Sequence, residues 1–461
     1  MKTERILARD VTKQVDRSVR MQGWAESIRR HSKVVFIDLR DRTGITQIVV
    51  TGEQLASIDS LTEESVVSVS GKVTLRPQSL VNPNVISGTI EVQAEDVQIE
   101  TLAAPLPFPL NDRTVGEETR LKYRYLDLRS KKMAENLRMR HKMNQYIRDY
   151  LTEKDFTEVE TPSISKSTPE GARDYLVPSR IAPGKFYALP QSPQQYKQLL
   201  MVGGMERYFQ IARCFRDEDA RGDRQPEFTQ LDIELSFASQ EDILELVESL
   251  FVGMVKKFFP EKTLTFGDTI PRLTHADVMT EHGSDKPDLR KDKGNQDELA
   301  FAFVVDFPLF EWDEKRKRYD AAHHPFTAPK AEYVDTFEKQ PKEALSQAYD
   351  LVLNGAEIAS GSIRINKPEL QSRIFEFIGH EKAAITEKFG HMIEAFTYGA
   401  PPHGGIAPGL DRIYTILLKE ETIRDVIAFA KSGDGRDLMM NAPSEVGDDQ
   451  LKELGIQLRD V

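Results

Sequence analysis

The segment between Phe215 and Asp232, FRDEDARGDRQPEFTQLD, constrains the fold of this chain more than any other stretch. An apolar run precedes it, and apolar and polar residues alternate from Phe228 to Leu235. This pattern predicts two β-strands joined by a long polar loop. Residues 216–227 contain three arginines and five acidic residues. Arginines on such a scaffold suit phosphate and carboxylate oxygens, whereas the plain alternative is a solvated loop with internal ion pairs.

The length and composition of the chain limit its class. With 461 residues it is too long for one hydrophobic core, which predicts two or three domains. It has no apolar run near the roughly 18 residues of a membrane span, no apolar signal-peptide core at its N-terminus and a single cysteine, Cys214. These features predict a cytoplasmic protein without an intrachain disulfide or a membrane partner. The net charge of −12 excludes non-specific binding to nucleic acid, so a nucleic-acid partner requires local basic patches.

Residues 1–104 consist of short alternating runs separated by turn residues. Five such runs in about 100 residues predict a small Greek-key β-barrel. A basic loop, Arg29–Lys33, separates two of the runs, and Phe36 follows it closely. Basic side chains beside an aromatic ring are typical of single-stranded nucleic-acid binding, in which bases stack on the ring. Because the neighbours of Phe36 alternate as in a strand, burial in the barrel core is the alternative.

Residues 105–132 form a connector whose start is stiffened by three prolines. Beyond it, helical and strand patterns mix. The apolar residues along Met133–Lys154 predict an amphipathic helix, and Phe156–Pro162 predicts a strand that ends at its proline. Residues 163–461 contain neither a GxxxxGKS or GxxxxGKT loop nor a GxGxxG turn after a strand. An ATP site in this part must therefore be of another kind.

Further polar clusters in this part carry side chains suited to binding or catalysis. They are the turn Ser167–Asp174, the helix start Pro190–Gln198, the paired histidines of Asp320–Phe326, the segment Asp350–Ile358 and the glycine-rich Gly404–Arg412. The first three also have plain interpretations: a tight turn, a capped helix with a solvated lysine, and a structural or metal-binding histidine pair. The fourth places two carboxylates across a strand, a turn and a strand, which suits Mg²⁺ together with phosphate oxygens. In the fifth, glycines permit close backbone approach, and an arginine at a helix entry suits a γ-phosphate.

In their order and spacing these motifs resemble class II aminoacyl-tRNA synthetases, and the wording FRDED…RQPEFTQLD resembles the bacterial-type aspartyl-tRNA synthetase family. The resemblance covers nearly the whole chain except 285–298, where bacterial members usually carry an inserted domain and this chain has a short polar loop. It implies an α+β fold with an N-terminal OB-fold β-barrel and a class II antiparallel sheet of six or seven strands flanked by helices. It assigns 1–104 to anticodon binding, 105–132 to a hinge and 133–461 to catalysis, with 284–298 as the short loop.

The resemblance also implies an activity. Such an enzyme activates L-aspartate with ATP and Mg²⁺ to aspartyl-adenylate, releases diphosphate, transfers aspartate to the 3′ end of tRNA(Asp) and acts as a homodimer. His31 lies in the anticodon-proximal loop and favours charging of tRNA(Asn) as well, the alternative being tRNA(Asp) alone. Two other functions remain. A non-catalytic synthetase-like protein is disfavoured by the retained phosphate and metal ligands, and activation of asparagine is disfavoured by the two cations Lys197 and Arg364.

By resemblance, the functional side chains fall into groups. Catalysis is assigned to Arg216, Glu357 and Arg412. Aspartate binding is assigned to Glu170, Gln194, Lys197, Arg216, Gln230, Asp232, His323 and Arg364. ATP binding is assigned to Arg216, Asp217, Glu218, Gln225, Phe228, Glu357, Gly409, Leu410, Asp411 and Arg412. Metal binding is assigned to Glu357 and Asp350, and anticodon contact to His31, Phe36, Gln47, Arg76 and Glu91.

Within these groups, Arg216 is expected on the α-phosphate, Phe228 on the adenine and Arg364 on the side-chain carboxylate of aspartate. The chain departs from the family pattern at two places. Ala359–Ser360 stands where two glycines are usual, and Pro408 stands where an aromatic or aliphatic residue is usual.

Overall fold

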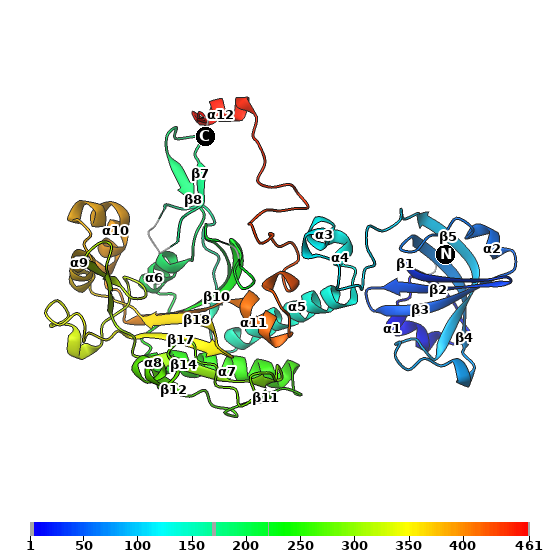
Figure 1. The fold of residues 1–461 in the computed structure, drawn as a ribbon, viewed down its shortest axis with the longest axis horizontal. Helices are drawn as coiled ribbons and strands as arrows, with labels where there is room; N and C mark the ends of the chain where they lie inside the picture. Colours follow the sequence, from blue (N-terminus) through cyan, green and yellow to red (C-terminus); the bar gives the residue numbers. More distant parts are fainter. Residues whose placement is uncertain (1–3, 168–171, 220, 460–461) are drawn as a thin grey trace. The chain divides into compact units, whose positions relative to one another are not determined.

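The computed structural model describes residues 4–167, 172–219 and 221–459 (Figure 1). The chain divides into two compact units, Met1–Asp112 and Arg113–Val461. Each unit has a hydrophobic core of its own. Within the described ranges, no helix is long and apolar enough to cross a membrane.

The first unit is a closed five-stranded barrel in the order β1-β2-β3-β5-β4. Its strands are β1 Ser18–His31, β2 Val34–Asp41, β3 Gly44–Thr51, β4 Val66–Leu75 and β5 Ile90–Thr101. Apolar residues at alternate positions, such as Val35, Ile37 and Leu39, fill the barrel interior. Short helical segments accompany it: α1 Ala8–Val11, η1 Thr12–Gln14, α2 Gln54–Ser57 and η2 Gln78–Leu80. The prediction of an N-terminal OB-fold barrel is confirmed.

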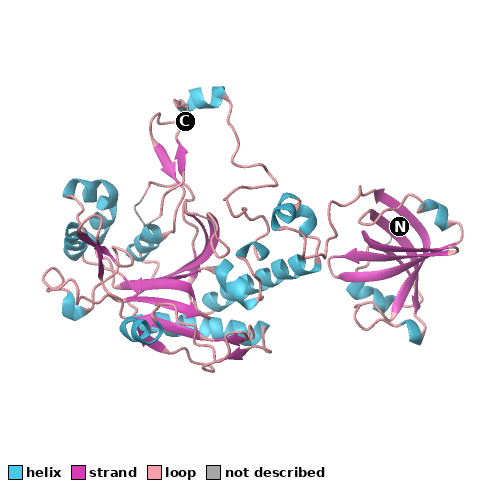
Figure 2. Ribbon diagram, in the orientation of Figure 1, coloured by secondary structure: helices cyan, strands magenta, loops and turns pink. Residues whose placement is uncertain are grey.

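The second unit is built on an eight-stranded sheet in the order β12-β14-β17-β18-β19-β10-β9-β6 (Figure 2). Its strands are β6 Thr157–Glu158, β9 Arg207–Phe215, β10 Glu227–Ser236, β12 Arg272–Thr274, β14 Phe301–Val305, β17 Ala348–Leu353, β18 Ala356–Ile363 and β19 His403–Pro408. The six inner strands are antiparallel, whereas β12 and β6 pair parallel with their neighbours. The antiparallel sheet is therefore confirmed, but it has more strands than the six or seven expected. The strand predicted over Phe156–Pro162 is present as β6 but is shorter than predicted, whereas β12, with three residues, is too short to show an alternating pattern in the sequence.

One face of this sheet packs against the helices α5 Lys131–Thr152, α7 Gln240–Phe258 and α11 Leu410–Leu417. The predicted amphipathic helix over 133–154 is confirmed by α5, which begins at the N-cap Ser130. Further helices are α3 Glu117–Lys122, α4 Arg124–Asp127, α6 Gln194–Val202, α8 His275–His282, η3 Ala331–Tyr333, α9 Pro368–Phe377, α10 Lys382–Thr397, η4 Ile423–Asp425 and α12 Asp448–Leu454. Small two-stranded pairs are β7 Leu176–Pro178 with β8 Phe186–Ala188, β11 Thr263–Leu264 with β13 Glu298–Leu299, and β15 Phe310–Asp313 with β16 Arg318–Ala321.

Apolar and polar residues alternate along β10, so the strand places apolar side chains on one face of the sheet and polar side chains on the other. Leu231 and Ile233 belong to the core beneath the helices. Gln230, Asp232 and Glu234 therefore point to the opposite face, where all three are buried. Because buried polar groups require partners, a row of three such side chains indicates that this face carries a functional site.

The beginning and the end of the second unit are bound to each other. Arg124 is 2% exposed and donates hydrogen bonds to the backbone carbonyls of Ile427 and Ala428, at 2.7 and 2.9 Å. Arg120 pairs with Asp425 at 3.2 Å. The folded unit thus depends on contacts between residues that lie more than 300 positions apart in the sequence.

Candidate active site

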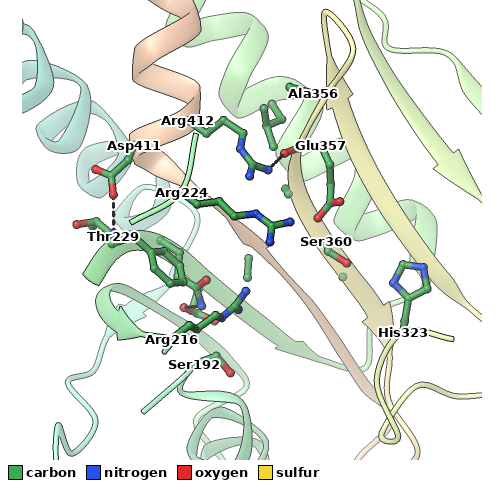
Figure 3. A pocket seen from close by; sticks show the side chains of 18 of the residues that line it. Ser192, Arg216, Arg224, Thr229, His323, Ala356, Glu357, Ser360, Asp411 and Arg412 are labelled. Atoms are coloured by element: carbon green, nitrogen blue, oxygen red, sulfur yellow. Dashed lines mark hydrogen bonds between the residues drawn. The ribbon is translucent and has the colours of Figure 1, made fainter. Parts of the chain in front are cut away.

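A cavity of about 560 Å³ opens on the polar face of the sheet (Figure 3). The β9–β10 hairpin, β18, the end of β19, and the starts of α6 and α11 contribute to its walls. The predicted residues that line it are Gln194, Lys197, Arg216, Glu218, Gln225, Phe228, Gln230, Asp232, His323, Glu357, Arg364, Gly409, Asp411 and Arg412. Segments far apart in the sequence therefore converge on one cavity.

Of the residues assigned to aspartate, ATP and metal, three described ones do not line this cavity, and a fourth lies outside the described residues. Asp217 is half-buried and pairs with Arg173, which does not line the cavity. Leu410 belongs to the hydrophobic core, so only its backbone can meet a ligand. Asp350 is buried on β17. Glu170 lies outside the described residues.

Two cations and two carboxylates form a buried network in one half of the cavity. Lys197 Nζ lies 2.9 Å from Oδ1 of Asp232 and 3.4 Å from Oε2 of Glu234. Arg364 donates to both carboxylate oxygens of Glu234, at 3.0 and 3.3 Å. Burial alone would raise the pKa of Glu234, but the charges of Arg364 and Lys197 hold this pKa below its usual value. Glu234 is therefore ionised at neutral pH.

Both cations of the network retain donors for a ligand. Arg364 has five N–H groups and makes four hydrogen bonds among the described residues, to Glu234, Ser362 and Gly405. Lys197 has three N–H groups and two carboxylate partners in the same part of the chain. Glu234 occupies the edge of the Arg364 guanidinium group formed by Nε and Nη2, so a ligand would meet the donors that remain.

The two neighbouring histidines both line the cavity. The ring of His323 packs edge-on against Phe307, with ring centroids 4.4 Å apart. His324 accepts a hydrogen bond at Nδ1 from the backbone of Phe326, at 3.3 Å, and its buried Nε2 has no partner among the described residues. Burial lowers the pKa of both rings, that of His324 well below its usual value, so Nε2–H of a neutral His324 is a donor for a ligand. The described residues contain no group of three potential metal ligands, which leaves the metal-binding interpretation of this pair without support.

Three arginines point into the other half of the cavity: Arg216, Arg224 and Arg412 (Figure 3). The guanidinium group of Arg216 lies over the ring of Phe228, 5.0 Å from its centroid. Arg412 pairs with Asp223 at 3.1 Å. Guanidinium groups that converge from a sheet and a helix suit the oxygens of a polyphosphate.

Two residues assigned to ATP, Asp411 and Gln225, use their polar groups in hydrogen bonds and ion pairs within the protein. Asp411 accepts a hydrogen bond from the backbone of Thr229, at 2.7 Å (Figure 3). Its other carboxylate oxygen pairs with Arg140. Gln225 exchanges two hydrogen bonds with the backbone of Lys431, at 2.8 and 3.2 Å. These contacts fix α11 and the C-terminal segment against the β9–β10 hairpin, so a nucleotide contact would be an additional role.

Two carboxylates on adjacent strands form the candidate metal site. Asp350 is buried, and its Oδ1 has no hydrogen-bond partner in the described part of the chain. Burial and the neighbouring charge of Glu357 raise the pKa of Asp350 well above its usual value. Lys286 Nζ lies 2.9 Å from Glu357 Oε2, and Arg412 donates to the backbone carbonyl of Glu357. A buried oxygen without a partner, beside a second carboxylate, fits a divalent cation that takes its other ligands from phosphate and water.

The two departures from the family pattern are compatible with this geometry. Ser360 lines the cavity. Burial raises the pKa of Asp350, and the hydrogen bond from Ser360 acts in the opposite direction. Pro408 ends β19 opposite Ala359, and Gly409 then donates to the backbone carbonyl of Ile358 at 2.8 Å. The strand pairing therefore continues past the proline.

The predicted anticodon residues lie on the outer side of the barrel of the first unit. Gln47 donates to Glu91 Oε2 at 2.9 Å. The ring of His31 meets that of Phe36 edge-on, with centroids 5.9 Å apart. Arg76 donates to the backbone carbonyl one residue before Glu91, at 2.8 Å. Side chains from several strands are thus linked on one surface.

The structure corrects two interpretations of this surface. Phe36 lies between inward-facing neighbours and is half-buried on the outside, so the alternative of a core position is wrong. The predicted basic loop begins too early, because Arg29 and Arg30 lie on β1. Arg29 joins the surface by pairing with Asp38 at 2.6 Å and donating to Gln47 at 3.3 Å, whereas Arg30 donates to backbone carbonyls beyond α2 and so has a structural role.

Several residues of the cavity and of the buried network beside it were not recognised from the sequence. Glu234 could have been found, since it stands two positions after Asp232 in an alternating strand and so shares its face. His324 and Arg224 lie next to or within motifs that were recognised. Lys286 gave no signal, because its polar neighbours predict only a surface loop.

The comparisons with known proteins agree with this architecture. Residues 116–433 match the family described as "tRNA synthetases class II (D, K and N)", and residues 19–100 match an "OB-fold nucleic acid binding domain". The first match covers more than half of the chain, which therefore belongs to the class II aminoacyl-tRNA synthetases. Members of this class use ATP with a divalent metal ion, together with an amino acid and tRNA.

Within this class, the chain is similar to proteins named aspartate–tRNA(Asp/Asn) ligase. The one from Rubrobacter xylanophilus is 40% identical over 96% of this chain and 95% of its own length. The one from Caldanaerobacter subterraneus subsp. tengcongensis is 43% identical over 97% and 96%. The crystal structure of asparaginyl-tRNA synthetase from Pyrococcus horikoshii complexed with asparaginyl-adenylate has a TM-score of 0.76 at 21% identity, covering 93% of this chain and 98% of that one. This last likeness is one of fold.

The relatives are longer than this chain. The alignment with the Rubrobacter protein spans 571 positions, which exceeds the 461 residues of this chain by 110. At least that many residues of the relative have no counterpart here, as expected for a chain that lacks an inserted domain.

Proposed function

We propose that the protein is an aspartate–tRNA ligase. In the first step the α-carboxylate of L-aspartate attacks the α-phosphorus of ATP. The bond between this phosphorus and the oxygen that bridges to the β-phosphorus breaks, and diphosphate leaves. In the second step a hydroxyl of the terminal tRNA ribose takes the aspartyl group and AMP leaves. The observation that carries the proposal is that one cavity is lined by two buried cations, Lys197 and Arg364, by Asp232, and by three further arginines. The resemblance to the family supports a cytoplasmic homodimer.

Charge balance in the cavity favours aspartate over asparagine. Lys197 and Arg364 face Asp232 and Glu234, so two buried cations oppose two buried anions. Bound aspartate adds an ammonium group, assigned to Asp232, and a side-chain carboxylate, assigned to the remaining donors of Lys197 and Arg364. The network then stays neutral, as burial requires. Asparagine would add the ammonium without the second carboxylate and leave a buried positive charge uncompensated.

Other side chains of this half position the substrate. Gln230 donates to Asp232 Oδ2 at 2.8 Å and thereby orients the carboxylate that faces the ammonium group. Gln194 has a buried Nε2 without a partner among the described residues, which suits a substrate oxygen. His324 lines the cavity near the charges of Arg364 and Lys197, and His323, assigned to aspartate, lines it near the charge of Glu357; burial lowers the pKa of both rings and favours their neutral form.

The other half of the cavity positions ATP. Arg216 is assigned to the α-phosphate, Arg412 to the γ-phosphate and Phe228 to the adenine ring. Fixed cations that meet the charge developing on the phosphoryl oxygens lower the barrier without a nucleophilic side chain. Glu357 and Asp350 would hold Mg²⁺, which would supply further positive charge to the triphosphate.

The barrel is assigned to the anticodon of tRNA(Asp). Phe36 offers an outward aromatic face for stacking a base, and the linked polar side chains of Gln47, Glu91 and Arg76 offer donors and acceptors beside it. His31, next to Phe36, favours acceptance of tRNA(Asn) as well.

The test is to follow charging of purified tRNA(Asp) and tRNA(Asn) separately, with labelled aspartate, ATP and Mg²⁺. Exchange of diphosphate into ATP is measured with aspartate and with asparagine, and Arg216→Ala is the blank. Aspartate-dependent exchange and charging of both tRNAs are expected. Charging of tRNA(Asp) alone would refute the assignment of His31, and absence of both exchange and charging would refute the enzyme.

A further inference from the structure

Lys286 lines the nucleotide half of the cavity although it belongs to the short loop 284–298. Its Nζ lies 2.9 Å from Oε2 of Glu357, the carboxylate assigned to the metal ion, and the two side chains are 40% and 31% exposed. The side chains of Lys197 and Asp232, in contrast, are 1% and 0% exposed. An ion pair open to water contributes little free energy and is easily broken, whereas a buried pair is costly to separate. The partner of Lys286 is therefore exchangeable.

The loop that carries Lys286 is held in place beside the cavity. The backbone N–H of Lys286 donates to Ser284 Oγ at 3.1 Å, and Asp288 pairs with Arg290 at 2.8 Å. The turn between β17 and β18 lies against the loop, since a Cβ added at Gly355 would meet Cβ of Asp288 at 3.2 Å. Lys286 is thus presented to Glu357 by a positioned backbone.

We propose that Lys286 is a nucleotide-binding residue, which exchanges Glu357 for a terminal phosphate oxygen of ATP when ATP binds together with the metal ion. This inference rests on the function proposed above and deepens it. A divalent cation at Glu357 withdraws the carboxylate from the ammonium group and repels it. The terminal phosphates of the same nucleotide then supply the nearest compensating negative charge.

The same geometry gives Lys286 a second effect. Without nucleotide, its ammonium group competes with a metal ion for Glu357, so the metal binds poorly by itself and well together with ATP. One substitution should therefore weaken ATP binding and strengthen metal binding to the nucleotide-free protein. A residue that only supports the loop would not produce these two opposite effects.

The test compares Lys286→Met with the wild type in three titrations of the full-length protein. Calorimetry with ATP and excess Mg²⁺ should show affinity reduced by about tenfold to a hundredfold, the range expected for one hydrogen bond between charged groups. AMP, which lacks the terminal phosphates, should bind within about twofold of the wild type. Titration of the nucleotide-free protein with Mn²⁺, followed by electron paramagnetic resonance, should show tighter binding in the variant.

Two further variants sharpen the outcome. Lys293→Met removes a charge from an exposed position of the same loop that does not line the cavity, and should leave all three titrations unchanged. Lys286→Arg keeps a cation and should keep most of the affinity for ATP.

Unchanged ATP affinity in Lys286→Met, or an equal loss for ATP and AMP, would overturn the inference. Failure of the wild type itself to bind ATP would instead refute the proposed function.

Discussion

The replacement Glu234→Gln tests whether the buried charge network holds the second unit together. The amide keeps the size of the side chain but removes the charge that faces Arg364 at 3.0 Å and Lys197 at 3.4 Å. Removing one partner of a buried ion pair typically costs about 3–5 kcal/mol. The lower end applies here, because Lys197 keeps Asp232 at 2.9 Å. We expect the free energy of unfolding of the second unit to fall by about 3 kcal/mol at pH 7.

The pH dependence of this difference has a definite sign. Although burial acts in the opposite direction, Arg364 and Lys197 hold the pKa of Glu234 below its usual value. A lowered pKa stabilises the folded state fully above the unfolded pKa of about 4.3, and this contribution is lost as the pH falls through the folded value. The difference between wild type and Glu234→Gln should therefore be constant near neutral pH and shrink below about pH 4.

The assay can report on the second unit alone. The chain has two tryptophans, Trp24 in the barrel and Trp312 in the second unit, so a Trp24→Phe background leaves Trp312 as the fluorescent probe during urea unfolding. Glu245→Gln, at an exposed position of α7, is the matched control. Equal urea midpoints for Glu234→Gln and this control at pH 7 would refute the reasoning. A difference that persists undiminished at low pH would also refute it.

Two further predictions test the barrel of the first unit and the metal site of the second unit independently. Phe36→Ala should reduce kcat/KM for tRNA charging by about tenfold or more, the loss expected when one base no longer stacks, and leave aspartate-dependent diphosphate exchange unchanged. A parallel loss of exchange would contradict the assignment of Phe36 to the anticodon. Removal of divalent cations with EDTA should abolish exchange, and added Mg²⁺ should restore it. Without a cation, the negative charge of the triphosphate would lie beside the carboxylates of Glu357 and Asp350 with nothing to neutralise it there. Exchange that persists at full rate in EDTA would argue against this metal site.

Much of the fold was predictable because its patterns are local. The apolar run before the arginine-rich loop and the alternation after it predict β9 and β10, and the spacing of apolar residues predicts α5. Edge strand β6 lies within the strand predicted over Phe156–Pro162 but is only two residues long, and the three residues of β12 carry no period by which to predict it. The barrel was predictable from alternation, but the outward position of Phe36 required the register of β2.

The cavity residues that lie within recognised sequence motifs were predictable, and the others were not. Glu234 takes its importance from Arg364, which lies 130 positions away in the sequence, and no local pattern announces such a pair. Lys286 reaches Glu357 only because the loop folds back onto the turn between β17 and β18. The direction of a loop side chain depends on tertiary packing, which composition does not encode.

The contacts that join the two ends of the second unit also have a consequence for translation. Arg124 leaves the ribosome some 300 residues before the carbonyl groups of Ile427 and Ala428 that accept its hydrogen bonds. The barrel strands, by contrast, are complete by Thr101 and enclose a core of their own. Because domains tend to fold in the order of their synthesis, the nascent chain completes the surface of its barrel long before the cavity of the second unit exists. Chains stalled ahead of residue 427 would therefore carry a finished barrel on an unfinished catalytic unit, with the charge of Arg124 still in water.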